Sequence, residues 1–77
     1  MARYYFDVHD GDGTFIDEVG IELGDMDHAV REARKALGDM VRDALREEDG
    51  HKLSVLIRDG ADGPVLLTVT MTTDGPP

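Results

Sequence analysis

The feature of the sequence that most constrains the fold is a long amphipathic segment at its centre. Asp25 is the expected N-cap of a helix, because its carboxylate can accept hydrogen bonds from the free amides of the first turn, and Gly50 is the expected stop. The pattern predicts a helix of about 22 residues, roughly 33 Å long. Its apolar positions recur at helical spacing and form one broad stripe: Met26, Ala29, Val30, Ala33, Ala36, Leu37, Met40, Val41, Ala44 and Leu45.

The segment before this helix has the alternation of β-strands. Arg3–His9 predicts a strand with Tyr4, Phe6 and Val8 on one face. The doubled Asp-Gly at 10–13 is a strong hairpin signal, and Thr14–Ile16 is the expected return strand. Residues 17–20 are typical of a polar turn, with glycine where a left-handed residue is needed. Residues 21–23 predict a short third strand or an extended entry to the helix.

The segment after the helix predicts a second hairpin. Leu53–Asp59 and Val65–Met71 both alternate, and residues 60–64 between them are typical of a turn. One helix packed on a mainly antiparallel sheet of four to five strands, in the order β-β-(β)-α-β-β, is the economical arrangement, so the predicted fold class is α+β. We expect residues 1–73 to form a single domain and residues 74–77 a C-terminal tail. The strand order is not fixed by the sequence.

Size and composition point to a marginal core. A chain of 77 residues buries only about 60% of the surface that its unfolded form exposes. It has no cysteine, so neither a disulfide nor a thiolate metal site can add stability. Extra burial must come from good packing or from self-association. There is no signal-peptide pattern and no apolar run of about 20 residues, so we expect a cytoplasmic protein that does not enter membranes.

A single helix covers one face of a sheet, which leaves the other face available for contacts. The side chains expected on that face form the candidate interface of a homodimer, through sheet-to-sheet or edge-to-edge contact. Plain exposure to solvent is the alternative for such a mixed surface. The candidate interface residues are Tyr5, Leu56, Leu66, Thr68 and Thr70.

The net charge of −9 is distributed unevenly. The stretch from Asp7 to Asp27 contains many carboxylates and neither lysine nor arginine, whereas five of the eight basic residues lie on the predicted helix. A net negative field repels phosphate backbones, so direct binding of nucleic acid is not expected. A basic protein partner or a cation is electrostatically favoured, and a solubilising surface is the simpler alternative.

No group of residues predicts catalysis. The only serine, Ser54, lies inside a strand pattern without a glycine-flanked elbow. His9, His28 and His51 do not have metal-ligand spacing and are expected on the surface. The glycines before the helix do not form a phosphate-binding loop. We therefore expect no enzyme activity, no catalytic or metal site and no cofactor.

The acidic hairpin begins like a calcium-binding EF-hand loop but departs from it twice. Phe15 stands where that loop requires glycine, and Ile21 stands at the twelfth position in place of the bidentate glutamate. A weak divalent site among Asp10, Asp12 and Asp17 stays open.

Several segments resemble a family of short bacterial proteins of unknown function. Members open with R-Y-[FY]-F-x-[VL]-x-D-G, continue through D-x-x-G-x-E-L and carry an alanine-rich helix and a final L-L-T-V-like strand. The matching segments are Arg3–Val8, Asp10–Gly11, Asp17–Leu23, the helix around Ala29, Ala33 and Ala36, and Leu66–Val69. Gly24 stands where members often have proline. The resemblance implies no activity, cofactor or catalytic residue. A fainter likeness of architecture is to the antitoxins of HicA–HicB-type pairs.

Two hypotheses of function follow. The first is a non-catalytic interaction module that binds itself or another protein, in keeping with the small core and the partly apolar outer sheet face. The alternative is an acidic, antitoxin-like inhibitor that covers a basic RNA-handling partner, suggested by the carboxylate-rich stretch and the HicB-like architecture.

Overall fold

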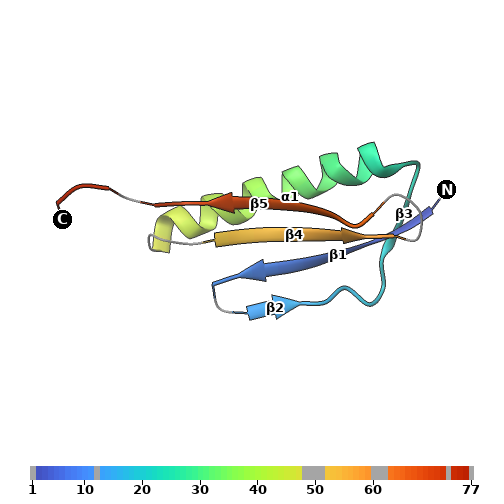
Figure 1. Ribbon diagram of the computed structural model, residues 1–77, viewed down its shortest axis with the longest axis horizontal. Helices are drawn as coiled ribbons and strands as arrows, with labels where there is room; N and C mark the ends of the chain where they lie inside the picture. Colours follow the sequence, from blue (N-terminus) through green and yellow to red (C-terminus); the bar gives the residue numbers. More distant parts are fainter. Residues whose placement is uncertain (1, 12, 48–51, 60–62, 73, 77) are drawn as a thin grey trace.

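The structure is a computed structural model that describes residues 2–11, 13–47, 52–59, 63–72 and 74–76. A helix and five strands follow one another in the order β-β-β-α-β-β, which confirms the predicted α+β class (Figure 1). Residues 21–23 form a strand rather than only an extended run-in to the helix. The elements are β1 (Ala2–Asp10), β2 (Gly13–Phe15), β3 (Ile21–Leu23), α1 (Met26–Glu47), β4 (Lys52–Arg58) and β5 (Val65–Thr70).

The sheet joins the two predicted hairpins through its central pair of strands. The order is β2-β1-β4-β5, and every pairing is antiparallel. β3 pairs with the first residues of β1, and β2 pairs with the last ones. β1 and β4, far apart in sequence, therefore lie side by side at the centre, while β2 and β5 form the outer edges (Figure 1).

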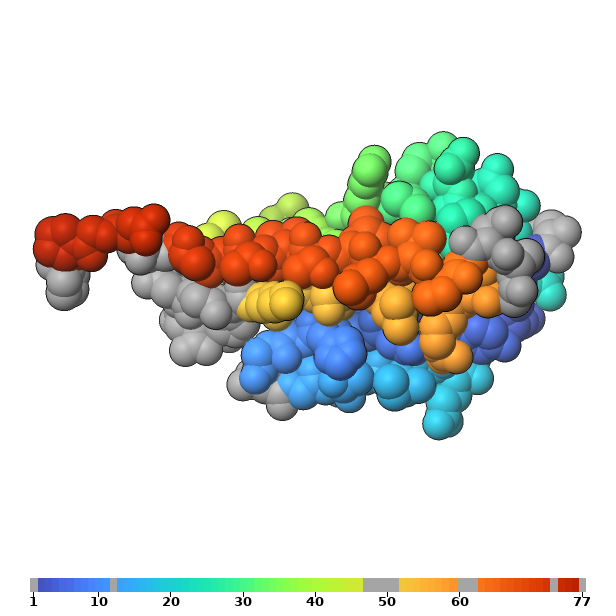
Figure 2. Space-filling view, viewed as in Figure 1, coloured from blue at the N-terminus to red at the C-terminus, as the bar shows by residue number. Residues whose placement is uncertain are grey.

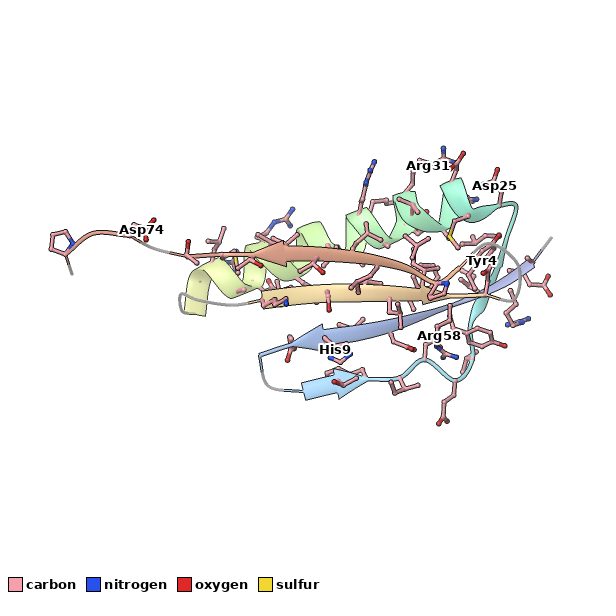
Figure 3. All side chains as sticks on the ribbon, viewed as in Figure 1. Tyr4, His9, Asp25, Arg31, Arg58 and Asp74 are labelled. Atoms are coloured by element: carbon pink, nitrogen blue, oxygen red, sulfur yellow. The ribbon has the colours of Figure 1, made fainter. Side chains whose placement is uncertain are left out.

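The predicted helix begins as expected at its cap. The Asp25 carboxylate accepts a hydrogen bond from the His28 amide at 2.9 Å. Figure 3 shows Asp25 at the start of α1 and Arg31 pointing away from the sheet. The buried core joins the helix to the sheet: Tyr4, Leu23, Ala29, Ala33, Leu37, Ala44, Leu53, Val55 and Ile57. The small alanines let the helix backbone lie close to the strands.

The helix covers only half of its side of the sheet, which is less than the sequence predicts. It packs against β4, β5 and β3, and Tyr4 near the start of β1 belongs to the same core, whereas β2 is left uncovered (Figure 1). Two residues of the predicted apolar stripe, Ala36 and Leu45, are consequently exposed. Phe15 on β2 is 67% exposed for the same reason. The stripe is wider than the two strands beneath it, so its margins face solvent.

The predicted turn at 17–20 does require its glycine. Gly20 has a φ of +72°, in the left-handed region that L side chains rarely adopt. A Cβ there would lie 2.9 Å from the Arg3 Cγ and 2.9 Å from the Tyr5 Cε2. The predicted helix stop at Gly50, Asp12 of the first hairpin and most of the turn at 60–64 lie outside the described residues. In the described part of the chain, no helix has the length and apolarity that a membrane crossing requires.

Candidate functional site

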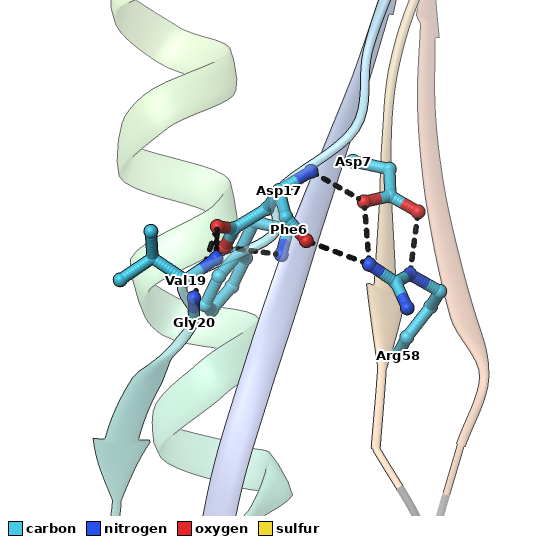
Figure 4. A network of polar contacts seen from close by, with 6 residues as sticks. All are labelled: Phe6, Asp7, Asp17, Val19, Gly20 and Arg58. Carbon is cyan, nitrogen blue, oxygen red and sulfur yellow. Dashed lines mark hydrogen bonds and ion pairs between the residues drawn. The ribbon is translucent and has the colours of Figure 1, made fainter.

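The most elaborate polar arrangement joins the middle of β1, the end of β4 and the loop after β2 (Figure 4). Asp7 is 4% exposed and receives two hydrogen bonds from Arg58. The Arg58 Nε lies 2.6 Å from the Asp7 Oδ2, and Nη2 lies 3.1 Å from Oδ1. The same Nη2 donates to the Asp17 carbonyl at 2.8 Å. This bidentate pairing fixes the position of the guanidinium against the sheet.

Asp17 organises the loop around its own carboxylate. Its Oδ1 accepts hydrogen bonds from the amides of Val19 and Gly20, each at 3.0 Å, and its Oδ2 accepts one from the Phe6 amide at 3.1 Å. The Asp17 amide in turn donates to Asp7 at 2.9 Å. The loop after β2 is thus held onto β1 by charge-assisted hydrogen bonds at a point where backbone pairing is interrupted.

These contacts shift the pKa values of Asp7, Asp17 and Arg58. The hydrogen bond from Arg58 is the main reason that the pKa of Asp7 lies below its ordinary value of 3.8. The amides of Gly20 and Phe6 lower the pKa of Asp17 in the same way, and the Asp7 carboxylate raises the pKa of Arg58. Carboxylates held ionised and fully engaged by donors are poor general bases, so the arrangement serves as a structural clamp.

Sequence reasoning missed this clamp and assigned both carboxylates to the acidic surface. The oxygens of Asp17 face the backbone amides described above rather than a shared divalent site with Asp10. Asp12, the third residue of that proposed site, lies outside the described residues. The signal available in the sequence was an aspartate in the middle of an aromatic strand, which needs a partner when a sheet buries it, and an arginine at the end of an apolar strand, which can supply one.

The five candidate interface residues do share the sheet face opposite α1, which is the face toward the viewer in Figure 2. The register pairs Leu56 with Leu66 and Ser54 with Thr68. Leu66 is 60% exposed, and Thr68 and Thr70 are also exposed. Leu56 is half-buried. Tyr5 is half-buried as well, because the Arg58 guanidinium lies 5.0 Å from the centre of its ring.

An open hollow of about 600 Å³ lies on this face near the end of β1, between β1, β4 and β5. The register places His9 directly opposite Ser54, a pairing that the sequence did not predict, and Figure 3 shows His9 toward the end of β1. The His9 ring interacts with Thr14 at 2.8 Å, but no hydrogen bond joins it to Ser54 in the part of the chain described. A serine nucleophile requires such a contact with its base.

The other histidines lie apart from this hollow. The His28 ring is 3.7 Å from Glu32 on the surface of α1, and His51 lies outside the described residues. Among the residues that the structure describes, no three acidic or histidine side chains are close enough together to hold a metal ion.

Comparison with known families gives one match that covers nearly the whole folded part of the chain. The model of a domain of unknown function, DUF6894, matches residues 3–72, which include the helix and all five strands except Ala2 at the start of β1. The chain belongs to the DUF6894 family. No curated protein and no solved structure matches this DUF6894 chain. The family membership confirms the resemblance to a family of unknown function, whereas the specific motif and the HicB-like architecture stay predictions.

Proposed function

We propose that this DUF6894 chain is a non-catalytic interaction module that acts by self-association, with the outer edge and open face of β5 as the contact. The observation that carries the proposal is the chemistry of this edge. β5 ends the strand order, and no described strand pairs with its outer side. Unpaired edge strands are templates for another chain, and proteins usually block them with charges, proline or bulges.

β5 has little of that protection. The sequence from Gly63 to Thr73 contains no charged residue in a chain that is 32% charged, and Pro64 lies just before the strand. Two copies with a net charge of −9 each repel one another over most of their surface. The uncharged edge is where they can approach with the least repulsion.

A two-fold axis beside β5 makes the contact self-complementary. Two β5 strands related in this way run antiparallel, and their backbones continue the sheet from one copy into the next. Leu66, Thr68 and Thr70 of both copies then lie on one continuous face, together with Leu56 and Tyr5 further from the axis. So small a core gains from this added burial.

The proposal is tested by the mass in solution of the wild type and two matched variants. Light scattering after gel filtration is expected to give twice the chain mass of 8.4 kDa for the wild type. Leu66→Asp places a charge beside the axis and is expected to give the mass of a monomer. Val19→Asp is the control, because Val19 is 76% exposed on the loop before β3, away from β5. A monomeric wild type, or equal loss of dimer in both variants, would contradict the proposal.

A second candidate is the acidic inhibitor of a basic RNA-handling protein. The charge of −9 favours it, although the structure reduces the surface that the carboxylate-rich stretch can offer. Asp7 and Asp17 are engaged in the clamp, Asp25 caps the helix, and Glu22 lies 3.4 Å from Arg3. Affinity for a basic partner that falls steeply with added salt supports this candidate, and affinity that is independent of salt counts against it.

A further inference from the structure

We infer that the Asp74–Gly75 unit is a site of spontaneous isomerisation to isoaspartate, and that β1 protects the same dipeptide at residues 10–11. Aspartate precedes six of the nine glycines of the chain. Asp-Gly is the dipeptide in which the side chain closes most easily onto the backbone, because glycine has no Cβ beside its amide nitrogen. The structure describes both residues of two of these pairs, 10–11 and 74–75. The inference does not depend on self-association.

The reaction requires no reagent other than water. The Gly75 amide nitrogen attacks the Asp74 Cγ, a carbon–nitrogen bond forms, and the amide proton leaves with the hydroxyl of the protonated carboxyl group as one water molecule. A second water molecule then opens the five-membered imide. Cleavage at the former side-chain carbonyl restores aspartate, whereas cleavage at the α-carbonyl leaves the chain running through the side chain, as isoaspartate. The mass of the chain is unchanged.

Asp74 has the freedom that ring closure requires. It is exposed and belongs to no helix or strand. Figure 3 shows it on the segment that projects past the end of β5, away from the helix and the sheet. No hydrogen bond or ion pair joins it to another residue in the described part of the chain. Its Cγ can therefore approach the next amide nitrogen without breaking a contact of the fold.

Gly75 leaves that nitrogen unobstructed. Its φ is +110°, a conformation that L side chains rarely adopt. A Cβ at this position would meet no heavy atom within 4 Å apart from its neighbours in the chain. Neither a side chain of residue 75 nor a packed segment therefore shields the attacking nitrogen.

Asp10 is held in the opposite way. It is the last residue of β1 and lies opposite Gly13 in the register. Its Oδ1 accepts a hydrogen bond from the Gly13 amide at 3.1 Å. Ring closure requires rotation about the Asp10 Cα–C bond out of the extended range of a strand and withdrawal of the carboxylate from that amide. The end of the β1–β2 hairpin must open first, so the fold slows the reaction here.

The test is to age the full chain at neutral pH and to locate isoaspartate by mass spectrometry with electron-transfer fragmentation. Trypsin leaves Asp10 in the peptide 4–31 and Asp74 in the peptide 59–77, so the two sites are read separately. Enzymatic methylation of the free α-carboxylate of isoaspartate gives an independent total. We expect isoaspartate to form at least about tenfold faster at Asp74 than at Asp10 in the folded chain.

Unfolding separates the effect of the fold from that of the local sequence. In guanidinium chloride the rate at Asp10 is expected to rise to within about threefold of the rate at Asp74, since the protection by β1 is lost. The rate at Asp74 itself is expected to change little, because no described contact holds it.

Two variants test the chemistry at the site. Gly75→Val is expected to slow isomerisation at Asp74 by at least about tenfold, because its branched Cβ crowds the nitrogen. Asp74→Glu is expected to abolish it, since the longer side chain would have to close a six-membered ring. The control is Asp39→Glu, because Asp39 is exposed on α1 and is followed by methionine.

Three results would overturn the inference. The first is equal formation of isoaspartate at Asp10 and Asp74 in the folded chain. The second is a rate at Asp10 that unfolding leaves unchanged. The third is a Gly75→Val chain that isomerises at Asp74 as fast as the wild type. The Leu66→Asp variant separates this test from the proposed dimer, because it is expected to isomerise at Asp74 as the wild type does.

Discussion

The two halves of the sheet are held in place by different interactions. In the β4–β5 half, apolar side chains pack under α1, and Leu53, Val55 and Ile57 are at most 2% exposed. In the β1–β2 half, only the first residues of β1 belong to this core, where Tyr4 is 2% exposed, and a polar clamp on the opposite face joins β1 to the loop after β2 and to the end of β4. Burial needs only the right pattern of residue types, whereas the clamp needs particular donors and acceptors at particular places.

The two halves also differ in what they leave exposed. In the half that α1 covers, the apolar side chains of β4 on the helix side are buried and those of β5, Val65, Leu67 and Val69, are half-buried. A half that is stabilised by a clamp on the opposite face can leave its helix side open, as the exposure of Phe15 shows. The clamp thus adds polar contacts beside a strand whose Phe15 side chain is left exposed.

The largest expected effect lies in the packed half. Ile57 is fully buried at the centre of the core, so Ile57→Ala is expected to lower the free energy of unfolding by about 2–5 kcal/mol, because it removes buried apolar contacts and leaves a cavity. Urea denaturation followed by circular dichroism measures it. The matched control is Val19→Ala on the exposed loop, for which we expect a change within about 0.5 kcal/mol. Similar losses in the two variants would contradict the division into two halves.

The next effect tests the clamp. Asp7→Ala is expected to lower the free energy of unfolding by about 2–3 kcal/mol, because charge-assisted hydrogen bonds from Arg58 and the bond from the Asp17 amide are lost together. Asp7→Asn keeps an acceptor oxygen and should lose less. In the Arg58→Ala background the Asp7→Ala change should lose much less than it does in the wild type, since the two residues act as one unit. Additive losses would show that the pair does not stabilise the fold.

The sequence predicts the packed half far better than the clamped half. Periodicity locates α1, β1, β4 and β5, and the Asp25 cap, because each depends on residues that are close together in the chain. The clamp joins residues 51 positions apart, and a carboxylate that is counted only as charge gives no sign of its partner. The partial covering of the sheet by α1 could not be predicted either. It depends on the central position of β1 and β4, and local sequence patterns do not determine strand order.

The candidate surfaces also differ in how well local sequence patterns predict them. Alternation along single strands correctly assigns Leu66, Thr68 and Thr70 to the face away from α1. That β5 is an outer edge, and that Phe15 is left uncovered, follow only from the pairing of β1 with β4. Contacts that are distant in sequence therefore decide which of the predicted surfaces are accessible.

The smallest effect is the pH dependence that the clamp confers. The pKa values of Asp7 and Asp17 are lower in the folded chain than their ordinary value of 3.8, so below about pH 4 the unfolded chain binds more protons than the folded one. The stability that these groups contribute is fully present above that pH and is lost as the pH falls through their folded values. Protonation of the other carboxylates relieves the repulsion among them, and this effect on stability is opposite to that of Asp7 and Asp17.

A comparison of variants isolates the contribution of the clamp. Urea midpoints measured from pH 7 to pH 3 are expected to fall less steeply below pH 4 in Asp17→Asn than in the wild type, because the variant has one shifted carboxylate fewer. Asp39→Asn is the control, since the Asp39 side chain is 77% exposed on α1, and its acid limb should parallel that of the wild type. An acid limb in Asp17→Asn as steep as that of the wild type would mean that the loop is held by its backbone alone. The distinction between a packed half and a clamped half would then have no energetic basis.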